Sequence, residues 1–119
     1  MRHYFQQRIR SFGYAFKGVY VLVRDTPNAR IHLLATVVVV GLGLGLELGW
    51  TEWALLALAM GMVWAAEAFN SALETLTDLS SPGRHPLAGK AKDLAAGAVL
   101  LAAIFAVVVA ACVFLPKLF

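Results

Sequence analysis

Residues 53–78 read WALLALAMGMVWAAEAFNSALETLTD, and this stretch decides the fold. An apolar run of this length predicts a helix that crosses a membrane. The second half of the same run carries Glu67, Asn70, Glu74 and Asp78. Because ionised carboxylates are costly near hydrocarbon, their presence in such a helix indicates a functional site.

The composition of the whole chain also indicates a membrane protein. Of its 119 residues, 61% are hydrophobic and 14% are charged, whereas a soluble domain is about half apolar and about a quarter charged. The only cysteine, Cys112, lies inside an apolar run, which excludes a disulfide framework and a metal site built from thiolates. We therefore expect an all-α integral membrane protein with a single domain over residues 1–119.

The first 25 residues have the pattern of a helix that lies on the membrane surface. One helical face carries apolar residues spaced by three and four positions: Phe5, Ile9, Phe12, Phe16, Val19 and Val23. Arg10, Lys17 and Arg24 fall away from that face, as cations facing anionic headgroups would. We expect an interfacial amphipathic helix over residues 1–25 and no nucleic-acid partner.

Three membrane helices are expected to follow, over residues 27–49, 53–79 and 92–116. Thr26 and Pro27 predict the start of the first, with Thr26 as the N-cap and Pro27 at the first helical position. Small residues recur every four positions on two of these helices and favour close helix packing. They are Gly41, Gly45 and Gly49, and Ala98, Ala102, Ala106 and Ala110.

The distribution of lysine and arginine predicts the orientation in the membrane. The N-terminal segment and the loop around residues 81–92 are rich in both, whereas the turn around residues 46–52 has neither. Because cytoplasmic loops carry the excess of these cations, we expect a cytoplasmic N-terminus and a C-terminus outside. The acidic end of the second membrane helix then lies at the cytoplasmic side.

Positions 67, 70, 74 and 78 share one face of that helix. At the helical rotation per residue they fall within an arc of about 80°. One interpretation is a polar stripe that joins helices, and another is a proton pathway. The loop that follows favours a more specific site, because it adds phosphate-binding cations to carboxylates that suit Mg²⁺. These loop residues are Arg84, His85, Lys90, Lys92 and Asp93.

Three segments together resemble the bacterial diacylglycerol kinase family, which includes undecaprenol kinases. They are EAFNSALETLTDL at 67–79, HPLAGKAKDLAAGAV at 85–99 and NARIHL at 28–33, and the resemblance covers roughly residues 10–110. It implies a homotrimeric bundle in the bacterial inner membrane, each subunit having a surface helix and three spanning helices. It also implies phosphorylation of a lipid alcohol, diacylglycerol or undecaprenol, with ATP and Mg²⁺. The segments HPLA and NARIHL are more similar to the undecaprenol kinase branch.

The resemblance also implies roles for individual residues. Glu67 matches the catalytic base toward the lipid hydroxyl, and Glu74 matches a carboxylate that binds Mg²⁺. The positions that match nucleotide-binding residues are Tyr14, Asn70, Glu74, His85, Lys92 and Asp93. Asp78 is either a supporting residue or a plain helix-end charge. Arg30 is either a headgroup anchor or a supporting residue that reaches a phosphate.

Two positions depart from the family pattern. Thr26 stands where a metal-binding glutamate is usual, so Asp25 is a tentative replacement ligand; Gln7 stands where some members have a nucleotide-binding arginine. These departures keep open a silent member that binds lipid or nucleotide without transfer. A third hypothesis is a small proton-coupled transporter that uses Glu67. His32 is expected to be a packing or interfacial residue rather than a ligand.

Overall fold

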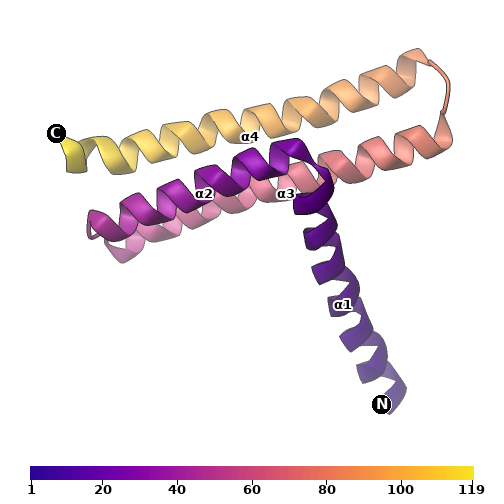
Figure 1. Ribbon diagram of the computed structural model, residues 1–119, viewed down its shortest axis with the longest axis horizontal. Helices are drawn as coiled ribbons and strands as arrows, with labels where there is room; N and C mark the ends of the chain where they lie inside the picture. The colour runs from indigo at the N-terminus through magenta and orange to yellow at the C-terminus, as the bar shows by residue number, and fades with distance from the viewer.

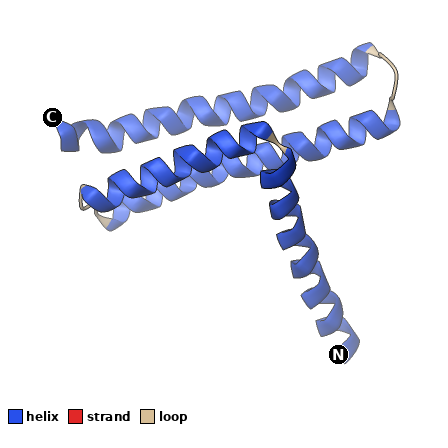
Figure 2. Ribbon diagram, in the orientation of Figure 1, coloured by secondary structure: helices blue, strands red, loops and turns tan.

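The computed structural model describes residues 1–119 and contains four helices and no strands (Figures 1 and 2). They are α1 (Arg2–Asp25), α2 (Pro27–Gly45), α3 (Trp50–Ser80) and α4 (Pro86–Leu118). The last three are long and apolar enough to cross a membrane. The expected all-α class with three candidate membrane helices is therefore confirmed.

The helix ends differ from the expected membrane segments for local reasons. α2 stops at Gly45 because the chain then turns, with Glu47 in the left-handed region at φ 54°. Gly49 thus lies outside the helix, and the predicted stripe of Gly41, Gly45 and Gly49 is wrong as a helical stripe. α4 begins at Pro86, ahead of residue 92, because proline suits the first helical position.

Helices α2, α3 and α4 run side by side, whereas α1 leaves the group at a steep angle (Figure 1). α3 and α4 form an antiparallel hairpin with the most extensive contact in the chain. Its small apolar core consists of Leu56, Val113 and Phe114 and lies near the α2–α3 connection. The polar residues of α3 lie toward the opposite end.

The corner between α1 and α2 forms at Thr26, which is extended at φ −111° and ψ 112°. A residue before proline is held out of the helical region, so α1 must end there. Arg30 reaches back and donates to the carbonyl oxygen of Arg24 at 2.6 Å, which satisfies one free acceptor at the end of α1.

Thr26 occupies the N-cap position of α2, but its hydroxyl accepts no backbone N–H. The predicted N-cap position of Thr26 is thus confirmed, although its side chain forms no capping hydrogen bond. The hydroxyl oxygen instead lies 3.5 Å from that of Ser71 on α3. This contact joins the start of α2 to α3 at the level of Ser71.

Most apolar side chains face outward from the single chain. Only 10 of the 119 residues are buried, so the apolar surfaces of the candidate spans face lipid or further subunits. Gly41 and Gly45 have open space where a side chain would extend, whereas Gly43 packs against the ring of Trp53. Close helix approach within the chain thus depends on Gly43.

Two helix starts with proline at the first position allow a matched test of capping. His85 Nδ1 accepts the N–H of Leu87 at 3.1 Å, whereas Thr26 makes no such bond. In nucleotide-free protein, His85→Ala should lower stability by about 0.5–1 kcal/mol, and Thr26→Ala should stay well below the usual cap value of about 1 kcal/mol. Thermal unfolding in detergent, with hydrogen exchange of the first turns, measures both. Faster exchange at the start of α2 in Thr26→Ala would contradict the uncapped assignment.

Candidate functional site

Glu67 and Asn70 are the only buried polar residues in the chain, with exposures of 0% and 7%. They line a pocket of about 260 Å³ between α2, α3 and α4. Asn28 and His32 of α2 face them across this pocket, and the α4 wall is apolar, formed by Ala96, Val99, Leu100 and Ala103. Neither Glu67 oxygen has a hydrogen-bond partner, so this carboxylate is available to a ligand.

A second pocket of about 670 Å³ forms where α3 passes into α4. It is lined by Asp78 from α3, by His85 and Arg84 from the loop, and by Lys92 from α4. Lys92 forms an ion pair with Asp78, which neutralises that carboxylate. The pocket thus brings together three cationic or imidazole side chains, a set suited to an anionic ligand.

Glu74 lies on α3 between the two pockets. It is exposed and forms no ion pair, unlike Asp78, and it is not buried, unlike Glu67. No group of three acidic, histidine or cysteine residues that could hold a metal ion forms within the chain. A single free carboxylate nonetheless fits Mg²⁺, which takes one or two carboxylates and completes its shell with waters and phosphates.

Asp25 lies outside both pockets at the α1–α2 corner. Arg24 donates to its two carboxylate oxygens at 2.7 and 3.1 Å, and these hydrogen bonds lower the pKa of the Asp25 carboxyl. The carboxylate is therefore ionised at neutral pH, but its charge is shared with Arg24. Arg30, directed at the carbonyl of Arg24, also stands at this corner.

Two predicted nucleotide-binding residues lie apart from the second pocket. Asp93 follows Lys92 in sequence but lines a different groove on α4, together with Lys90 and Leu94, because successive helical residues are rotated by about 100°. Tyr14 is 72% exposed on α1, which points away from the bundle (Figure 1). Within one chain, the predicted site residues are not all brought together.

Two residues beside Glu67 were not predicted from the sequence as site residues: Asn28 was not considered, and His32 was expected to be a packing or interfacial residue. Asn28 and His32 are four positions apart on α2, so they share a face, and both line the Glu67 pocket. The Nε2 atom of His32 lies 3.3 Å from Oε2 of Glu67. The sequence signal for these two residues was the spacing of Asn28 and His32, two polar side chains four positions apart at the start of an apolar span.

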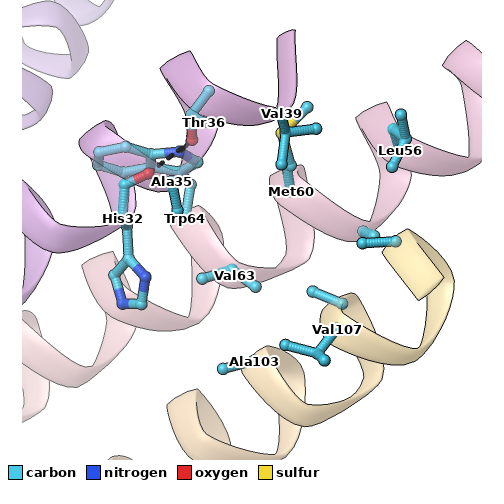
Figure 3. Close-up of a pocket in the computed structure, with 13 residues that line it drawn as sticks. His32, Ala35, Thr36, Val39, Leu56, Met60, Val63, Trp64, Ala103 and Val107 are labelled. Carbon is cyan, nitrogen blue, oxygen red and sulfur yellow. Dashed lines mark hydrogen bonds between the residues drawn. The ribbon is translucent and has the colours of Figure 1, made fainter. Parts of the chain in front are cut away.

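A third pocket, of about 180 Å³, adjoins the one at Glu67 and is almost wholly apolar (Figure 3). The two share His32 and Ala103. Its far walls are formed by Val39 and Leu56, toward the opposite membrane face. An apolar pocket therefore lies directly beside the pocket of the buried carboxylate.

Comparison with known sequences identifies the family of this chain. The family of prokaryotic diacylglycerol kinases matches residues 13–114. This chain belongs to that family. It is accordingly a lipid kinase of the membrane, and the acidic face of α3 lies within the matched segment.

Individual members of the family are similar over most of the chain. The undecaprenol kinase of Bacillus subtilis is 37% identical over 109 residues, which cover 92% of this chain and 89% of that protein. A diacylglycerol kinase of Synechocystis is 45% identical over 109 residues, 91% of this chain but 62% of that protein. A diacylglycerol kinase of Escherichia coli is 31% identical over 104 residues, 87% and 85% of the two chains.

Proposed function

We propose that this kinase transfers the terminal phosphoryl group of Mg²⁺-bound ATP to the hydroxyl of a membrane lipid alcohol, diacylglycerol or undecaprenol. The reaction takes place at the cytoplasmic face of the bacterial inner membrane, with the N-terminus inside and the C-terminus outside. The observation that carries the proposal is the fully buried Glu67, without a hydrogen bond, at the deep end of a polar face of α3.

In the proposed mechanism each part of this face has its own task. The lipid hydroxyl enters the Glu67 pocket, and its chain occupies the adjoining apolar pocket. Glu67 accepts the hydroxyl proton as the oxygen bonds to the terminal phosphorus, and the bond to the bridging oxygen breaks to release ADP. Asn70, one turn away, orients the reacting groups.

The outer end of the face is assigned to the nucleotide. Lys92, His85 and Asp93 contact the phosphates and the nucleoside, and Glu74 would hold Mg²⁺, which would offset the phosphate charge. Asp78 supports Lys92 through their ion pair. Asp25 would be a second metal ligand once its ion pair with Arg24 opens, and Arg30 supports the same corner.

The overall proposal is tested by the fate of the terminal phosphate. Purified protein in mixed micelles should transfer radiolabel from ATP to a lipid alcohol in a Mg²⁺-dependent reaction. We expect label in undecaprenol or diacylglycerol, and the more efficient acceptor identifies the substrate. ATP binding without transfer would instead identify a silent member, and a proton flux independent of ATP would identify a transporter.

Glu67 and Glu74 should fail in different ways when each is changed to glutamine. Glu67→Gln should lower kcat by a factor on the order of 10² or more, with the KM for ATP nearly unchanged, because it removes a base and no nucleotide contact. Glu74→Gln should mainly raise the Mg²⁺ and ATP concentrations needed for half-maximal rate. Steady-state kinetics over a Mg²⁺ titration separate the two. Near-normal kcat in Glu67→Gln would refute its assignment.

We also propose that the working unit is a homotrimer whose sites are shared between subunits. The support is that α1 carries Tyr14 away from the pockets of its own chain and that most apolar surface is outward-facing. A neighbouring α1 then brings its Tyr14 to the nucleotide.

Mixed oligomers test this sharing. Subunits with Glu67→Gln and subunits with Tyr14→Ala should each be poorly active alone at low ATP. Refolded together, they should recover activity well above the average of the two, because some sites combine an intact Glu67 with an intact Tyr14. Cross-linking gives the subunit number and verifies mixing. Activity that never exceeds the average in well-mixed oligomers would contradict a shared site.

A further inference from the structure

One contact in the Glu67 pocket has no role in the mechanism above. His32 of α2 places its Nε2 atom 3.3 Å from Oε2 of Glu67, with side-chain exposures of 17% and 0%. The two atoms do not meet in hydrogen-bond geometry, and Oε1 of Glu67 is also without a partner.

The position of His32 is fixed by two neighbours. The indole Nε1 of Trp64 donates to the hydroxyl of Thr36 at 3.0 Å, and that hydroxyl donates to the carbonyl of His32 at 2.7 Å (Figure 3). The Trp64 ring also meets the imidazole edge-on, with centroids 6.2 Å apart. Since Trp64 lies one turn before Glu67 on α3, this network sets the distance between the imidazole and the carboxylate.

We propose that His32 is a positioning residue for Glu67, which it holds ionised and oriented to accept the proton of the lipid hydroxyl. This inference rests on the proposed function. A buried carboxylate without a partner is strongly disfavoured in its charged form, whereas an imidazolium beside it offsets that penalty. With Oε2 directed to His32, Oε1 remains available to the hydroxyl.

No other titratable group competes for this contact. Facing α4 residues are apolar, and Lys92 is paired with Asp78. Glu74 is exposed further along α3. At the corner with α1, Arg24 is paired with Asp25 and Arg30 is directed at a backbone carbonyl. His32 is thus the one titratable side chain that lies against Glu67.

The test compares His32→Gln, which keeps a hydrogen-bond donor, with His32→Phe, which keeps the ring and removes every polar atom. We expect kcat at neutral pH to fall about 10- to 100-fold in His32→Phe and less in His32→Gln. The KM for ATP should stay within about twofold of the parent value. His3→Phe, on the exposed first turn of α1, is the matched control and should leave kcat unchanged.

A pH profile separates positioning from packing. If His32 favours the ionised carboxylate, the acidic limb of the kcat profile should move to higher pH in His32→Phe and should move less in His32→Gln. A packing role lowers thermal stability and leaves this limb in place. Because His32→Gln is the milder change, it keeps the profile measurable even when His32→Phe folds poorly.

The decisive variant combines His32→Phe with Glu67→Gln. If His32 acts through Glu67, the double variant should be no more than about twofold slower than Glu67→Gln alone. The inference would be overturned if the loss of kcat in the double variant equalled the product of the losses in His32→Phe and Glu67→Gln. It would also be overturned if both single His32 variants folded, kept normal kcat and left the acidic limb in place. Those outcomes leave the proposed function intact. A fully active Glu67→Gln refutes the role of Glu67 as the base, and only a parent protein without lipid phosphorylation refutes the proposed function itself.

Discussion

The corner at Thr26–Pro27 determines which part of the acidic face is buried. Proline fixes the backbone where α2 begins, and the residue before it cannot remain helical, so α1 must leave the bundle there. The start of α2 therefore meets α3 at the level of Ser71. Below that level Glu67 and Asn70 are enclosed by three helices, and above it Glu74 and Asp78 are exposed. One helix face is thereby divided into an enclosed half and an open half.

This division matches two reactants with opposite solubilities. The enclosed half adjoins an apolar pocket that suits a lipid chain, and the open half adjoins a loop rich in cations. At 1.5 Å per residue, the 31 residues of α3 extend about 46 Å, well beyond a hydrocarbon core of about 30 Å. A single straight helix thus connects the lipid phase to the aqueous phase, and the proposed phosphoryl transfer takes place along its length.

The sequence was sufficient for the features that depend on periodicity. The helical class, the three apolar helices and the common face of Glu67 and Asn70 follow from hydrophobic pattern and from rotation per residue. Contacts between helices were less accessible, because the register of α2 against α3 depends on how side chains such as Trp64 and Thr36 pack. The proximity of His32 to Glu67 was missed for this reason. Sequence position likewise did not show that Asp93 lines a different groove from Lys92 within one chain.

Two ion pairs lie at opposite ends of the α3–α4 hairpin. Lys92 meets Asp78 next to the loop, and Lys117 meets Glu52 at 3.4 Å near the far end. Exposed pairs of this kind add little to stability, but both join residues in the same antiparallel alignment. Axial slippage by one helical turn, about 5.4 Å, separates both pairs at once and draws a charged side chain toward hydrocarbon. The hairpin therefore resists sliding at both membrane faces, which keeps the depth of Glu67 constant relative to the cationic loop.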